Sequence, residues 1–220
     1  MDRRSEDSFV AAVRAGDLAA VKAMLAAQPG LETTRRDGAS ALLIARYHGR
    51  HEIVALLRDR LTDLDIFEAA ALGERARVET LLDGDPGRAN AVADDGFGPL
   101  GLAAFFDHEP VVALLLERGA RVDAASANAM RVMPLHSAAA ARSIPIARRL
   151  LERGASVNAR QGTGEFGFTP LMEAAFNGQR AMVDLLLEHG AERTLRDDKG
   201  LTAADHARQN GYASLGHHLA

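Results

Sequence analysis

A single small residue recurs along almost the whole chain at intervals close to 33 residues. Alanine stands at seven matching positions, which are Ala12, Ala45, Ala69, Ala103, Ala138, Ala174 and Ala207. The intervals between them are 33, 24, 34, 35, 36 and 33 residues. A shared period in this range indicates an array of helical repeats, because each short unit must bury its apolar face against its neighbours. Residues 1–220 are therefore predicted to form one array of seven units rather than separate globular domains.

The stretch from Thr169 to Ala191 shows what one unit contains. Thr169 can cap a helix with its hydroxyl group, and Pro170 can occupy the first helical position, where its missing N–H is not needed. Gly178 interrupts the apolar pattern, and Gly190 stands where a glycine commonly ends a helix. The apolar residues before and after Gly178 fall on one stripe of each segment. The stretch therefore predicts a helix, a tight turn and a second helix.

Two motifs recur at the start and the end of such units. The first occupies 98–101, 133–136 and 169–172 around a Pro-Leu pair, and the second, Leu-Leu-Glu-(Arg/His)-Gly-Ala, occupies 115–120, 150–155 and 186–191. Together they resemble the ankyrin repeat, and the resemblance extends from about Ser8 to Leu219. It implies an all-α fold, an ankyrin-type α-solenoid of stacked antiparallel helix pairs with β-hairpin-like finger loops. It also implies that His136 forms hydrogen bonds that hold its turn.

The third unit departs from the pattern. The units are placed at roughly 5–36, 37–60, 61–91, 92–124, 125–159, 160–195 and 196–220. The short interval between Ala45 and Ala69 leaves no room for a finger, so Leu61, Thr62 and Asp63 can form only a tight link. We therefore expect a notch in the groove between units two and three, where the stack depends on helix contacts alone. Hydrogen exchange should show a weaker seam there than between units five and six.

The composition limits the classes of partner. The net charge of −4 offers no case for a concentrated basic surface, so nucleic acid binding is not expected. The absence of cysteine excludes disulfide bonds and thiolate metal sites. No run approaches the roughly 20 apolar residues of a membrane span, and the first residues lack the apolar core of a signal peptide. We expect a cytoplasmic monomer that binds neither nucleic acid nor a membrane.

One motif could suggest an enzyme or a nucleotide binder. Residues 162–167 satisfy the pattern G-x-G-x-x-G, but dinucleotide binding needs a buried strand before the loop, and here a finger precedes it. The eight histidines form no ligand set, and no nucleophile elbow or phosphate loop occurs. We therefore predict no catalytic residue, no cofactor and no metal ion. A nucleotide-binding or enzymatic protein that uses the 162–167 loop remains the alternative.

Aromatic residues at variable positions indicate a binding surface. In proteins that this chain resembles, the concave binding face is formed by the fingers and by the two variable places after the paired small residues. Phe105 and Phe106 are consecutive helix residues and cannot both point into one stripe, so at least one ring should remain in water. Phe97 and Phe168 have two alternatives, exposure on the finger or packing onto their own helices. The predicted partner-binding residues are Tyr47, His48, Phe97, Phe105, Phe106, Phe166, Phe168 and Phe176.

The predicted function follows from these positions. We expect a non-catalytic protein–protein interaction module that binds a partner protein through its concave groove and fingers. A purely structural spacer is the other alternative, and it requires no exposed apolar groove.

Overall fold

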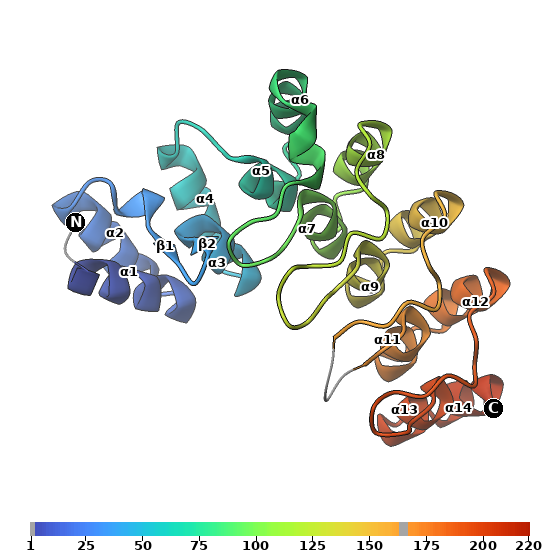
Figure 1. Cartoon of the computed structure of the whole chain (residues 1–220). Coiled ribbons are helices and arrows are strands. Elements are labelled where there is room, and N and C mark those ends of the chain that lie inside the picture. Colours follow the sequence, from blue (N-terminus) through green and yellow to red (C-terminus); the bar gives the residue numbers. More distant parts are fainter. Residues whose placement is uncertain (1–2, 163–166) are drawn as a thin grey trace.

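The protein is almost entirely helical, as the repeat pattern predicts. A computed structural model describes residues 3–162 and 167–220, and these contain fourteen α-helices (Figure 1). The helices are α1 (Arg3–Ala15), α2 (Leu18–Ala27), α3 (Ala41–Tyr47), α4 (His51–Arg60), α5 (Ile66–Leu72), α6 (Arg75–Gly84), α7 (Pro99–Phe105), α8 (Glu109–Glu117), α9 (Pro134–Ala140), α10 (Ile144–Glu152), α11 (Pro170–Phe176), α12 (Arg180–Glu188), α13 (Ala203–Gln209) and α14 (Ala213–Leu219). Two short 3₁₀-helices, η1 (Leu31–Thr33) and η2 (Pro86–Asn90), precede the loops that lead to α3 and α7.

The helices form two curved rows. The odd-numbered helices lie along the inner, concave side of the array, and the even-numbered helices cover its outer side (Figure 1). Each odd-numbered helix packs against the even-numbered helix that follows it and against the next odd-numbered helix. The solenoid of stacked helix pairs is therefore confirmed, whereas the boundaries of the seven units stay a prediction.

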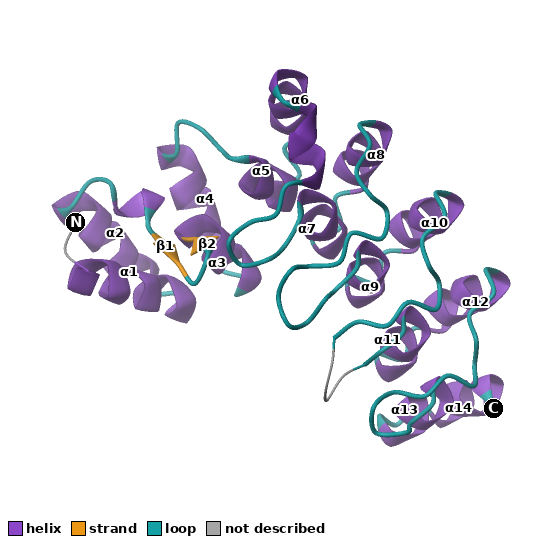
Figure 2. Cartoon of the chain, viewed as in Figure 1, coloured by secondary structure: helices purple, strands orange, loops and turns teal. Residues whose placement is uncertain are grey.

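One finger forms a regular hairpin. Strands β1 (Arg35–Arg36) and β2 (Ala39–Ser40) pair in antiparallel fashion and are the only strands in the part of the chain that the structure describes (Figure 2). The two residues between them, Asp37 and Gly38, have positive φ angles of 53° and 84°. An Asp-Gly turn with two positive φ angles matches the right-handed twist of the strands that it joins. The sequence pattern at this finger therefore produces a true β-hairpin.

Side-chain caps begin several inner helices, including the one predicted at Thr169. The Thr169 hydroxyl oxygen accepts a hydrogen bond of 3.3 Å from the Met172 N–H at the start of α11. Asp65 and Glu68 form a reciprocal capping box at the start of α5, where each side chain accepts a backbone N–H of the other residue. Such caps satisfy N–H groups that the first helical turn leaves free.

The recurring alanines lie where neighbouring helices meet. Six of the seven have no exposed surface; Ala12, in the terminal α1, is half-buried and leaves Val13 to fill the core. A methyl side chain at these places lets the backbones of adjacent helices approach closely. The recurring alanines therefore mark positions where neighbouring helices contact each other closely.

A substitution at Ala138 tests whether these positions are close helix contacts. We expect Ala138→Leu to destabilise the protein by about 1–3 kcal/mol, because the extra methyl groups overpack a fully buried contact. Ala140→Leu is the matched control, since Ala140 ends the same helix α9 but is exposed, and its effect should stay within about 0.5 kcal/mol. Urea unfolding of both variants measures the difference, and equal losses would contradict a close contact at Ala138.

The junction between the second and third helix pairs is stabilised by more than helix contacts. This corrects the expectation that the stack there depends on helix contacts alone. The short link from Leu61 to Asp65 carries no finger, as predicted, and the outer helices α4 and α6 diverge (Figure 1). However, the Gly38 turn reaches the next loop, where a Cβ added at Gly38 would lie 2.3 Å from the carbonyl carbon of Asp94. An ion pair of 2.5 Å also joins Arg35 to Asp65. The hairpin thus bridges the place of the missing finger, and the weaker seam in hydrogen exchange stays a prediction.

Candidate interaction surface

Four aromatic side chains meet on the concave side. Tyr47 ends α3, Phe97 lies in the loop before α7, and Phe105 and Phe106 stand at the end of α7. The Tyr47 ring centroid lies 5.8 Å from that of Phe106, in stacked orientation, and 6.2 Å from that of Phe97. The rings of Phe105 and Phe106 meet edge to face with centroids 5.0 Å apart. We call these four residues the aromatic cluster.

Polar contacts hold the cluster in place. The Arg46 guanidinium lies 4.4 Å above the centre of the Phe106 ring, and its Nε donates a hydrogen bond of 3.2 Å to the Ala71 carbonyl. The Tyr47 hydroxyl donates to Asp95 Oδ2 at 3.1 Å. Burial and the Asp95 carboxylate both raise the Tyr47 pKa well above its usual value, so the phenol stays protonated. The second helix pair is thus linked directly to the fourth, across α5.

Two phenylalanines of the predicted binding surface are exposed. Phe105 is 44% exposed and Phe176 is 42% exposed, at the same place in α7 and α11, while the rings of Tyr47, Phe97 and Phe106 are half-buried. The prediction that one ring of the Phe105–Phe106 pair remains in water is therefore confirmed. His48 is also exposed, and its Nδ1 lies 3.0 Å from the Ile44 carbonyl oxygen.

Phe168 does not belong to the exposed surface, which corrects its assignment as a binding residue. It is only 7% exposed, because its ring packs 4.6 Å from the His206 ring and 5.9 Å from that of Phe176. Its carbonyl oxygen lies 3.0 Å from His136 Nε2. Phe166, the remaining predicted binding residue, lies outside the described residues, as does most of the 162–167 loop.

His136 holds the turn that the resemblance implies. It is 1% exposed, and burial lowers its pKa to about 4, so the neutral ring donates its Nε2–H to the Phe168 carbonyl. A second buried histidine, His206, contacts Asp197 Oδ2 at 2.8 Å. Burial opposes ionisation of Asp197, but hydrogen bonds from the Leu201 N–H and from His206 outweigh it and lower its pKa. Through their contacts with Phe168, both histidines join neighbouring units.

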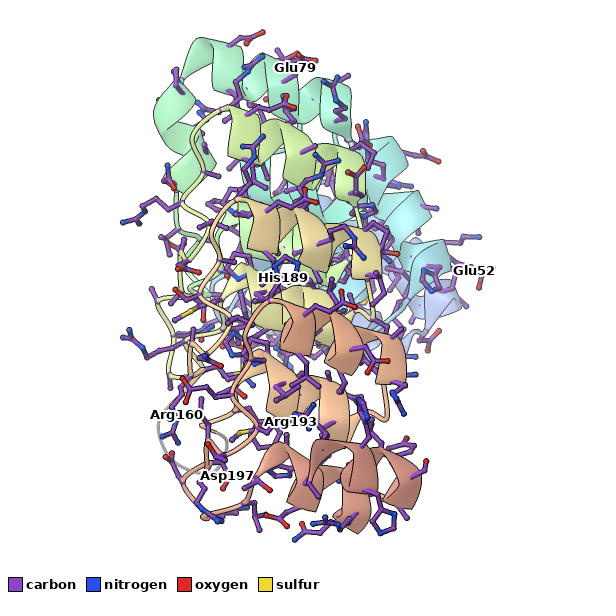
Figure 3. The ribbon with its side chains drawn as sticks, turned by 90° about the vertical axis from the view of Figure 1, so that its right-hand side faces the viewer. Glu52, Glu79, Arg160, His189, Arg193 and Asp197 are labelled. Atoms are coloured by element: carbon purple, nitrogen blue, oxygen red, sulfur yellow. The ribbon has the colours of Figure 1, made fainter. Side chains whose placement is uncertain are left out.

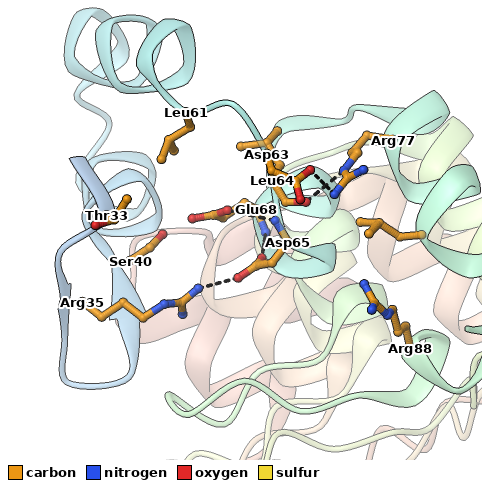
Figure 4. Close-up of a pocket in the computed structure, with 11 residues that line it drawn as sticks. Thr33, Arg35, Ser40, Leu61, Asp63, Leu64, Asp65, Glu68, Arg77 and Arg88 are labelled. Carbon is orange, nitrogen blue, oxygen red and sulfur yellow. Dashed lines mark hydrogen bonds and ion pairs between the residues drawn. The ribbon is translucent and has the colours of Figure 1, made fainter. Parts of the chain in front are cut away.

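A polar cavity occupies the space beside the missing finger (Figure 4). Its volume is about 300 Å³, and it lies between the β-hairpin, the 61–65 link and α6. Arginines and carboxylates alternate along its wall, and the ion pairs of Arg35 with Asp65 and of Arg77 with Asp63 neutralise them mutually. Burial and the Asp65 carboxylate raise the Glu68 pKa at this site. The remaining arginine of the wall, Arg88, forms an ion pair of 3.6 Å with Asp85. The residues that line the cavity are Thr33, Arg35, Ser40, Leu61, Asp63, Leu64, Asp65, Glu68, Arg77, Leu81 and Arg88.

A metal site and a membrane-spanning helix are both absent from the described residues. No group of three or more histidine, aspartate or glutamate side chains is placed there to hold a metal ion. None of the helices described is long and apolar enough to cross a membrane. Glu52 of α4 and Glu79 of α6 lie on outer helices, apart from Arg160 and Asp197 near the C-terminal finger loops (Figure 3).

Sequence reasoning missed several residues of this surface. Arg46 and Asp95 complete the aromatic cluster, and His206 covers Phe168. Only Asp95 carried a signal in the sequence, since it belongs to an Asp-Asp-Gly run that is typical of a turn. Each contact joins residues at least 25 positions apart, and the repeat period does not specify such contacts.

A curved stack of helix pairs with finger loops on its concave side defines the protein as a helical-repeat solenoid. A family profile described as ankyrin repeats (3 copies) matches residues 66–161 and 135–219. The chain is similar to the ankyrin repeat and SAM domain-containing protein 6 of Mus musculus, with 31% identity over 141 residues, and to that of Rattus norvegicus, with 30% over 141 residues. The match covers 64% of this chain but 12% of each relative. The chain belongs to the ankyrin repeat family, whose members are generally protein–protein interaction modules and typically not enzymes.

Proposed function

We propose that the protein is a non-catalytic interaction module that binds a partner protein through its concave groove and fingers. The observation that carries the proposal is Phe105, a large apolar side chain that is 44% exposed although its neighbour Phe106 is packed. A contiguous exposed apolar patch on a protein usually marks an interaction site, and we propose that Phe105 belongs to one. Phe176, two helix pairs further along, is exposed at the same place in its helix.

The two alternatives are less well supported. A structural spacer gives no reason for Phe105 and Phe176 to be exposed on the same side. A nucleotide-binding or enzymatic role would depend on the 162–167 loop, and a thermal-shift measurement with added nucleotides tests it directly. In the proposed role the protein acts as a cytoplasmic monomer that binds neither nucleic acid nor a membrane.

Phe105→Ala should weaken partner binding by about 2 kcal/mol or more, because exposed aromatic rings that become buried carry much of the energy of an interface. Its folding stability should change little, since much of the ring is already in water. The partner is first captured from native lysate with the wild-type protein and identified by mass spectrometry. Its affinity for each variant is then measured with purified proteins.

Phe106→Ala is the contrasting variant for this prediction. Its half-buried ring contacts Tyr47 and Arg46, so its removal should lower the free energy of unfolding by about 1–3 kcal/mol. If Phe105→Ala lowered stability as much and left capture intact, the ring would serve packing between units, and the proposed binding surface would be wrong.

A further inference from the structure

We propose that the surface around Phe105 binds an arginine-bearing segment of a partner protein, with an apolar side chain of that segment beside the arginine. This inference rests on the proposed function and specifies the chemistry of its partner. It starts from two features: an exposed ring, and two carboxylates next to the cluster in the sequence that form no ion pair with the described residues.

Two carboxylates directly neighbour, in the sequence, residues that form or hold the aromatic cluster. Asp94 stands at the finger turn next to Asp95, and Asp107 directly follows Phe106 in the turn after α7. Both are exposed, and neither side chain has a hydrogen bond or ion pair with any residue that the structure describes. Asp95, by contrast, is engaged by the Tyr47 hydroxyl. Two other finger carboxylates form ion pairs, Asp37 with Arg14 and Asp198 with Arg160.

The cluster already holds one guanidinium of the protein itself. Arg46 lies over Phe106 at 4.4 Å from the ring centre, which is the geometry of a cation–π contact. Phe105 packs edge to face with Phe106, and none of the described cations lies over its ring, so part of its surface is free for one. Arginine suits this place better than lysine, because its planar, weakly hydrated guanidinium stacks on a ring and can also donate to a carboxylate.

The negative charges of Asp94 and Asp107 favour one kind of bound segment over the others. A nucleic acid would bring phosphates toward Asp94 and Asp107 and would be repelled. An acidic or purely apolar segment would leave both carboxylates without a partner. A segment with arginine next to an apolar residue places the guanidinium near the carboxylates and the apolar side chain on the exposed part of Phe105.

The test uses a random peptide library displayed on phage and selected on the intact protein. We expect the selected peptides to share an arginine next to an apolar residue. A synthetic selected peptide is then measured by fluorescence anisotropy against the wild type, Phe105→Ala, the double variant Asp94→Asn with Asp107→Asn, and Glu52→Gln. Glu52→Gln is the matched control, since it removes an exposed charge on the outer helix α4.

The expected results are specific. Phe105→Ala and the double aspartate variant should each weaken binding by about tenfold or more, and Glu52→Gln should leave it unchanged. Replacing the peptide arginine with glutamine should weaken binding to the wild type about as much as the aspartate substitutions do. Added salt should weaken wild-type binding more than binding to the aspartate variant.

Other outcomes would overturn the inference in distinguishable ways. Peptides that need Phe105 but contain no arginine, or that bind the aspartate variant as well as the wild type, would refute the partner chemistry and leave the proposed function standing. No selected peptide, or peptides that bind Phe105→Ala unchanged, would count against both. Concentration-dependent dimers that Phe105→Ala abolishes would assign the surface to a second copy of this chain instead.

Discussion

Replacing Gly38 with alanine should destabilise the protein by about 2–5 kcal/mol in total. Its φ of 84° lies in the left-handed region, which costs a residue with a Cβ about 1–2 kcal/mol. The added methyl group would also lie 2.3 Å from both the Asp94 carbonyl carbon and the Asp95 nitrogen. Because backbone atoms cannot move aside as a flexible side chain can, the contact adds about 1–3 kcal/mol of overpacking.

Gly200→Ala separates these two contributions. Gly200 also lies at a finger turn with a positive φ of 78°, but a Cβ there would meet nothing within 4 Å. Its replacement should therefore cost only the roughly 1–2 kcal/mol of backbone strain. The midpoint of urea unfolding measures both variants. Equal losses at Gly38 and Gly200 would show that the hairpin does not press against the next loop.

Lowering the pH from 7 to 4 should destabilise the wild type more than a His136→Gln variant, by about 3 kcal/mol. Burial lowers the His136 pKa from 6.5 to about 4 in the folded protein, whereas the unfolded chain keeps a value near 6.5. The stability that depends on neutral His136 is therefore complete above pH 6.5. It is lost as the pH falls from 6.5 toward 4, because the unfolded chain then binds a proton that the folded protein excludes.

Glutamine is the suitable replacement because its amide can still donate a hydrogen bond to the Phe168 carbonyl but does not titrate. Buried carboxyl groups with raised pKa values, such as Glu68 and Glu173, are present in both proteins, so their contributions cancel in the difference. The measurement is the free energy of unfolding in urea at several pH values. Parallel pH profiles for the two proteins would contradict a buried, neutral His136.

Local sequence features were sufficient to predict the repeat fold. The alanine interval, the Thr169-Pro170 start and the Gly178 turn predict paired helices without tertiary information, because caps, turns and apolar stripes depend on residues within one or two turns. The interval of 24 residues likewise identified the missing finger. The exposure of one ring in the Phe105–Phe106 pair followed from the helical period alone.

Contacts between units were decided only by the tertiary structure. Phe97 and Phe168 both lie in finger loops, yet the Phe97 ring packs on Tyr47 of a different unit and the Phe168 ring is buried against His206. The period specifies which residues share a face, but not the distance and angle between one unit and the next. Here the missing finger brings the Gly38 turn against Asp94 and lets Tyr47 reach Phe106 across α5. The helices and their order were therefore determined by sequence, whereas the composition of the exposed surface depended on how neighbouring units stack.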